Sequence, residues 1–346
     1  MSPPSPALRQ LARCVACGSD RTHDGEQVKG FQLATCSDCG LSFTRNPDYN
    51  IKHYADAYSG QSAGTGRTSV DDGGDRYGGP MQRLALEAQA LRLPPPRLGP
   101  AEREAVAWVR RVAPPGATLV DLGCGTGRFG RALLRHGYRP LGVDVSPLLV
   151  ETLTRAGLPA VCGTATDFPW TEAADPFALS MFEVLEHLPE PRTILEAVHA
   201  RFPRSWFIAT VPSPFRTEVL LERRHEEGDC PPHHFLRWTS TALERCFQAV
   251  GYGRVEVVMP PPDGAEFLPG LGALGHRAKA LLGRRAGPSA PTGGGAPVAR
   301  PLRSTAALWT HHVYNATAEL LGTPKARAAA EKGASSVSLF VVAHPS

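Results

Sequence analysis

The chain has 346 residues, of which 42% are hydrophobic and 20% charged, the composition of a globular protein with a sizeable core. No apolar run approaches the length of a membrane span, and residues 1–13 lack the apolar core of a signal peptide. We therefore expect a cytoplasmic protein without a membrane span. The formal net charge of only +4 argues against a nucleic-acid partner.

Two cysteine pairs lie near the N-terminus, each in the pattern CxxCG. They read Cys14-Val-Ala-Cys17-Gly and Cys36-Ser-Asp-Cys39-Gly. Two turns that each present a pair of thiolates supply the four soft ligands of a tetrahedral Zn²⁺ site, and the glycine lets each turn close. Four cysteines leave no open coordination position, so the sequence predicts a zinc ribbon with a structural metal.

Composition divides the chain into three parts. We expect the zinc ribbon and a connecting segment over residues 1–58, and a flexible linker with a short helix over residues 59–100, where Gly, Ser and Asp are frequent at first. An α/β domain should follow over residues 101–346. It contains an insertion at about 261–333, whose middle is rich in Pro, Gly and Ala.

Within the third part, predicted strands alternate with predicted helices. Apolar periodicity, N-caps and proline stops indicate helices at 102–112, 128–136, 147–155, 191–200 and 239–250. Short β-branched runs indicate strands at 117–122, 139–143, 159–162, 177–182, 205–210, 254–259 and 336–343. This alternation predicts an α/β fold with a doubly wound, Rossmann-like sheet of seven strands and helices on both faces.

The turn after the first of these strands is rich in glycine, since residues 120–130 read VDLGCGTGRFG. Two interpretations compete. Residues 125–130 fit GxGxxG, and Asp144 follows at the distance of a ribose-binding acid, which indicates an NAD-linked oxidoreductase. Alternatively, Asp121 with Gly123, Gly125 and Gly127 forms a loop that lets backbone approach S-adenosylmethionine, which has no pyrophosphate.

Three acids in chain order favour S-adenosylmethionine. Asp121 would serve the ammonium of its amino-acid part, and Asp144, followed by Val145, would accept hydrogen bonds from both ribose hydroxyls. Asp167 would accept from the adenine amino group, with Phe168 against the ring. Each acid falls at the carboxyl end of its predicted strand, at the sheet edge where open α/β folds bind ligands.

The segments VDLGCGTGRFG, GVDVSP, TATDFPW and FEVLEHLPEP together resemble the successive motifs of class I S-adenosylmethionine-dependent methyltransferases. EVLEHL is similar to the branch that contains the ubiquinone-biosynthesis O-methyltransferases and enzymes acting on sugars and natural products. The resemblance implies a small-molecule acceptor methylated on oxygen or carbon, with Glu183 beside the methionine part of the cofactor. It departs at Ala178, where the family often has Asp. The N-terminal ribbon resembles a segment attached to many such bacterial enzymes.

Three histidines are candidates for the base that removes the acceptor's proton. His187 ends the EVLEH sequence, and the resemblance implies that it faces the pocket or braces it. His233 and His234 resemble the histidine-containing loop of zinc-bearing sugar C-methyltransferases. For each of the three, a purely structural hydrogen bond is the competing interpretation.

Two other functions stay open. The ribbon would be the reader in an RNA methyltransferase, although its basic residues are balanced by acids. The GxGxxG match keeps the NAD-linked oxidoreductase as the second alternative. The sequence names neither the methyl acceptor nor the oligomeric state.

Overall fold

The computed structural model describes residues 10–49, 98–167, 175–214, 229–263, 323–324, 326–328, 330–331 and 336–346. The chain divides into two compact units, Met1–Pro260 with Ser335–Ser346, and Pro261–Ala334. The sheets and the cysteine cluster belong to the first unit. The predicted linker up to residue 97 and most of the predicted insertion lie outside the described residues.

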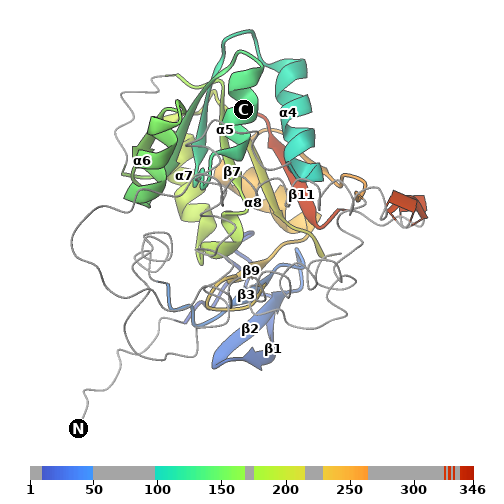
Figure 1. Cartoon of the computed structure of the whole chain (residues 1–346). Helices are drawn as coiled ribbons and strands as arrows, with labels where there is room; N and C mark the ends of the chain where they lie inside the picture. The colour runs from blue at the N-terminus through green and yellow to red at the C-terminus, as the bar shows by residue number, and fades with distance from the viewer. Residues whose placement is uncertain are drawn as a thin grey trace, which may run out of the picture. The chain divides into compact units, whose positions relative to one another are not determined.

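A seven-stranded sheet forms the centre of the first unit within the described residues (Figure 1). Its spatial order is β10-β11-β8-β7-β4-β5-β6. The strands are β4 (Thr118–Leu122), β5 (Arg139–Asp144), β6 (Ala160–Cys162), β7 (Ala178–Phe182), β8 (Trp206–Pro212), β10 (Val255–Val258) and β11 (Ser338–Ala343). Strands β4 to β8 run parallel, whereas β11 is antiparallel to both of its neighbours. The predicted seven-stranded, Rossmann-like sheet is confirmed.

Helices cover both faces of this sheet, as predicted. On one face, α4 (Pro100–Val112) and α5 (Arg128–Arg135) share a buried cluster with alternate residues of the strands, among them Leu119 and Ile208. On the other, α7 (Pro191–Arg201) and α8 (Ser240–Val250) share a cluster with the intervening residues. Side chains alternate between the two faces of a strand, and both faces of this sheet are covered by helices. The strands therefore need apolar residues at nearly every position, which explains why they are rich in leucine and β-branched residues.

Local signals in the sequence explain where the helices begin and end. The α6 helix (Pro147–Arg155) has the predicted bounds: Ser146 Oγ accepts a hydrogen bond from Leu149 N at 3.4 Å, and Pro147 occupies the first helical position. At the C-cap of α8, Gly251 takes a φ of 117°, which favours glycine.

The N-terminal segment forms a small antiparallel sheet of β1 (Thr22–Val28), β2 (Phe31–Cys36) and β3 (Ser42–Thr44). A strand from the α/β part of the chain, β9 (Leu236–Arg237), completes it in the order β1-β2-β3-β9. The ribbon also shares its buried apolar residues with the cluster under α7 and α8. The ribbon is therefore built into the first unit.

In the part of the chain that the structure describes, no helix combines the length and apolar character needed to cross a bilayer.

Candidate functional site

The four cysteines of the two CxxCG sequences come together. Cys14 Sγ lies 3.6 Å from Cys39 Sγ, and Cys17 Sγ lies 3.6 Å from Cys36 Sγ. All four sulfur atoms lie within 4.8 Å of one another. Sulfurs around a tetrahedral zinc are about 3.8 Å apart, because each Zn–S bond is about 2.3 Å long. The donor set and its spacing therefore fit Zn²⁺.

The two knuckles close as the glycine positions require. Gly18 N donates to Cys14 O and Gly40 N donates to Cys36 O, each at 2.9 Å. Both glycines have positive φ values, 78° and 76°. These turns aim the sulfur pairs inward, so the sequence itself dictates the geometry of the cluster.

The glycine-rich turn after β4 has one open position between two closed ones. A side chain on Gly123 would meet Val184 Cγ2 at 2.6 Å, and one on Gly127 would meet Leu158 Cδ2 at 2.5 Å. On Gly125 it would meet nothing within 4 Å. Gly123 and Gly127 thus allow the chain to pack, whereas Gly125 presents bare backbone to open space, as a loop that cradles a ligand should.

Asp121 is buried at the end of β4, on the sheet face covered by α4 and α5. It accepts a hydrogen bond from Ser180 Oγ on β7 at 2.7 Å, and 4% of the residue is exposed. Burial raises the pKa of Asp121 to about 7, and the charges of Glu102 and Asp144 add to the rise, while the Ser180 hydrogen bond opposes it. A bound cation beside this carboxyl would favour its ionised form.

Asp144 ends β5 and faces the glycine-rich turn. Its Oδ2 accepts from Gly125 N at 2.9 Å and its Oδ1 accepts from Ser146 N at 3.0 Å. Burial raises the pKa of Asp144, and these backbone hydrogen bonds partly counter the effect. Each oxygen keeps acceptor capacity for a hydroxyl group, because a carboxylate oxygen has two lone pairs. Val145 beside it is half-buried.

Asp167 lies after β6 on an exposed turn. It accepts from Thr164 N at 2.5 Å and from Thr164 Oγ1 at 2.6 Å, and these bonds lower the pKa of the Asp167 carboxyl. Its carboxylate is therefore held in place and ionised at neutral pH. Phe168, predicted to lie against the adenine, falls outside the described residues.

Glu183 follows β7 in a conformation that side chains rarely adopt, with a φ of 54°. Its amide donates to Thr210 O on β8 at 2.9 Å, and the next residue, Val184, packs against Gly123. Backbone strain of this kind concentrates at functional sites. The turn after β7 therefore lies beside the glycine-rich turn after β4.

The candidate histidines come from two loops and meet. His187, at the end of the 3-10 helix η2 (Leu185–His187), lies with its ring centroid 4.6 Å from that of His234. His187 Nδ1 is 2.8 Å from the backbone oxygen of His233. The His233 side chain is itself buried. Sequence separated these residues by more than forty positions, and the fold joins them.

Two carboxylates flank the histidine pair. His234 Nδ1 lies 3.3 Å from Asp229 Oδ1, and His187 Nε2 lies 4.0 Å from Glu186 Oε1. All four side chains are mostly buried. Possible ligand atoms of Glu186, His187 and His234 also lie within 4.8 Å of one another, a spacing that a divalent cation could use. Asp229 was missed by sequence reasoning, although an acid close before a histidine pair was the available signal.

Comparisons with known proteins agree with this geometry. Residues 99–257 match the family model of the methyltransferase domain. A ubiquinone biosynthesis O-methyltransferase of Xanthomonas campestris is 26% identical over 177 residues, which cover 45% of this chain and 73% of that protein. The enzyme of the same name from Xylella fastidiosa is 33% identical over 96 residues, 25% of this chain and 38% of its own length.

Solved structures overlap more weakly. Magnesium protoporphyrin IX methyltransferase from Synechocystis, with bound SAH, is 15% identical, with coverage of 61% of this chain and 93% of that one and a TM-score of 0.41. The plantazolicin methyltransferase BpumL in complex with SAH is 13% identical, with coverage of 86% and 98% and a TM-score of 0.43.

The match of residues 99–257 to the methyltransferase domain, together with the order of the sheet, its reversed strand β11 and the glycine-rich turn, supports a class I S-adenosylmethionine-dependent methyltransferase. Its methyltransferase domain occupies the matched residues, and β11 closes the same sheet from beyond them. The oxidoreductase suggested by GxGxxG is not favoured by these findings.

Proposed function

We propose that this enzyme methylates a hydroxyl group or an acidic carbon of a small molecule, with His187 as the proton acceptor. The observation that carries the proposal is the contact of the His187 ring, on the turn after β7 that also carries Glu183, with the ring of His234 from the loop after β8. The names of the matched ubiquinone biosynthesis O-methyltransferases support a hydroxylated small-molecule acceptor and not RNA.

The cofactor would lie along the carboxyl ends of β4, β5 and β7. S-adenosylmethionine supplies an electrophilic methyl group on its sulfonium. Asp144 would accept from the ribose hydroxyls, and Asp121 and Glu183 would hold the amino-acid part. Asp167 would accept from the adenine amino group. The open backbone at Gly125 supports this placement, because a ligand can approach the backbone there more closely than it could if the residue had a side chain.

The tautomer of His187 follows from its partner. A backbone carbonyl can only accept, so His187 Nδ1 donates to His233 O, and the lone pair of the neutral ring sits on Nε2. Glu186, 4.0 Å from Nε2, would stabilise the imidazolium that forms when this nitrogen takes a proton. Asp229, whose Oδ1 lies 3.3 Å from His234 Nδ1, would likewise orient the ring of His234. Proton removal raises the nucleophilicity of the acceptor, and the site holds the acceptor atom close to the methyl group of the cofactor.

The cysteine cluster would hold one structural Zn²⁺. Its four sulfurs complete a tetrahedron, so the metal would stabilise the ribbon and take no part in the transfer.

The proposal is tested with methyl-labelled S-adenosylmethionine and a panel of catechols, hydroxylated quinones and nucleotide-linked sugars as acceptors. We expect label in at least one hydroxylated compound. With that acceptor, His187→Gln should lose turnover by roughly 10²–10⁴, while its affinity for S-adenosylhomocysteine stays within a few-fold. Near-normal turnover of both His187→Gln and His234→Gln would contradict a histidine base.

A control separates the base from a metal. If His187, His234 and Glu186 held a cation instead, the purified enzyme would contain a metal beyond the one zinc of the ribbon. Metal analysis of wild type and His234→Gln therefore accompanies the turnover assay.

A further inference from the structure

Residues 233–238, here named the bridging segment, run between the site and the ribbon. One edge of this segment is bound to η2. Phe235 N donates to Glu186 O at 2.8 Å, and His187 Nδ1 donates to His233 O at 2.8 Å. The backbone of the bridging segment thus holds the turn that presents His187.

The other edge of the bridging segment is bound to the ribbon. Phe235 O accepts from Thr44 N at 3.0 Å and from Thr44 Oγ1 at 3.1 Å. Strand β9 continues this contact, with Leu236 opposite Phe43 of β3. Phe235 therefore links the ribbon to the active-site turn through its own backbone, its N–H toward η2 and its C=O toward Thr44.

The second cysteine knuckle itself contacts Thr239, the residue that follows the bridging segment. Thr239 Oγ1 donates to Cys39 O at 2.6 Å, and a side chain on Gly40 would meet Thr239 Cγ2 at 3.2 Å. Thr239 also caps α8 by accepting from Ala242 N. The second CxxCG turn is therefore seated on the start of α8, one residue beyond the bridging segment.

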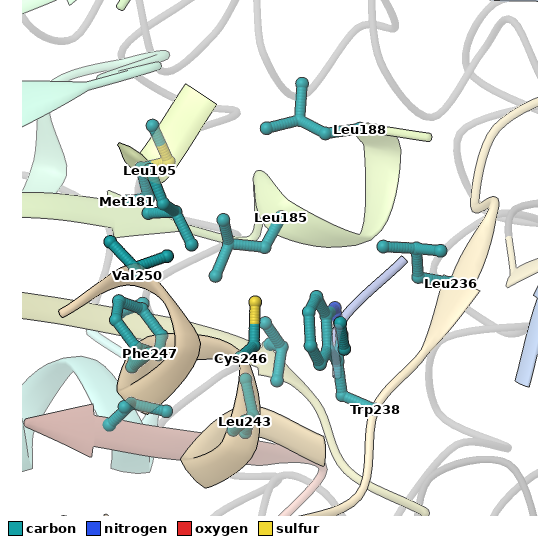
Figure 2. Close-up of a cluster of buried hydrophobic side chains, with 14 of the residues drawn as sticks. Met181, Leu185, Leu188, Leu195, Leu236, Trp238, Leu243, Cys246, Phe247 and Val250 are labelled. Carbon is teal, nitrogen blue, oxygen red and sulfur yellow. The ribbon is translucent and has the colours of Figure 1, made fainter. Parts of the chain in front are cut away.

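Burial makes these contacts hard to replace by water. Thr44 is 1% exposed and Phe235 is 2% exposed. Leu236 and Trp238 lie in one apolar cluster with Leu185 of η2 and Cys246 of α8, as Figure 2 shows. A buried carbonyl that loses its donor pays the full cost of desolvation.

We infer that the ribbon is a positioning element of the active site: its closed cysteine knuckles, through Thr44 and Thr239, fix the bridging segment and so the placement of His187 and His234. The inference rests on the proposed role of these histidines. It assigns the ribbon to the acceptor side, because the contacts of Asp121 and Asp144 described above come from β7 and from the turns after β4 and β5, and not from the ribbon.

Hydrogen exchange followed by mass spectrometry tests the inference on the full chain. Removing zinc with a chelator should make the amides of residues 233–238 exchange on the order of a hundredfold faster, while β4 and β5 keep their protection. Thr44→Val should speed their exchange about three- to tenfold, the effect of one buried hydrogen bond. Thr44→Ser keeps the hydroxyl and should restore the slow rate.

A matched control lies elsewhere in the ribbon. Thr35→Val removes a hydroxyl that contacts Ser42 Oγ at 3.1 Å, so it should leave exchange in the bridging segment unchanged. Calorimetry with S-adenosylhomocysteine, run on the same proteins, should give affinities within threefold of one another, on the order expected when no cofactor contact changes.

Unchanged exchange after zinc removal would overturn the inference. So would equal acceleration in the bridging segment and in β4, because the ribbon would then stabilise the fold as a whole. If the wild type fails to bind S-adenosylhomocysteine, the proposed function fails instead, and the exchange comparison still decides the positioning role.

Discussion

Asp121→Asn tests whether the buried carboxyl group near the end of β4 lowers the stability of the protein when no cofactor is bound. The pKa of Asp121 rises from 3.8 to about 7, chiefly through burial. The folded protein then binds this proton more tightly than the unfolded chain, so the contribution of Asp121 to stability becomes more unfavourable as pH rises from about 4 to about 7. Above that window the cost is on the order of 4 kcal/mol.

Asparagine keeps an acceptor for Ser180 Oγ but carries no charge. The variant should therefore gain stability relative to wild type, and the gain should be about 2–3 kcal/mol larger at pH 8 than at pH 5. Urea unfolding without cofactor across this range measures it. Asp175→Asn, an exposed carboxylate before β7, is the matched control and should show no such trend. A pH-independent difference between wild type and Asp121→Asn would refute the reasoning.

The remaining predictions concern zinc, cofactor and catalysis. Purified protein should contain about one zinc per chain, measured by metal analysis, and Cys17→Ser should lose most of it. Asp144→Ala should weaken S-adenosylhomocysteine binding by about 1–3 kcal/mol in calorimetry, because it strands two ribose hydroxyls, and NAD should not bind either protein. Gly127→Ala should lower the free energy of unfolding by about 1–3 kcal/mol, since its Cβ would lie 2.5 Å from Leu158 Cδ2. Gly125→Ala carries a similar backbone strain, since Gly125 also has a positive φ (52°), but its Cβ meets no protein atom within 4 Å, so it should destabilise the fold less and weaken cofactor binding; equal unfolding energies for the two variants would contradict this division.

The elements of the sheet could be predicted because their signals are local. The α6 helix was predicted with its observed bounds, since a serine N-cap and a proline at the first position mark its start. Asp121 is the penultimate residue of β4 and Asp144 is the last residue of β5, so both acids lie at the carboxyl ends of their strands as expected. No local pattern indicates Ser180 as the partner of Asp121, because the two residues lie 59 positions apart in the chain.

The sequence by itself determined the four clustered cysteines, the glycine-rich turn and the alternation of strands and helices, because each depends on residues close together in the chain. Only the tertiary structure decided that His187 meets His234, that Asp229 joins them and that β9 completes the ribbon. A two-residue strand has no periodicity to detect, and its partner β3 lies almost two hundred residues away. Such contacts form because burying the apolar residues around Phe43 and Trp238 brings the two segments together, which no local pattern records.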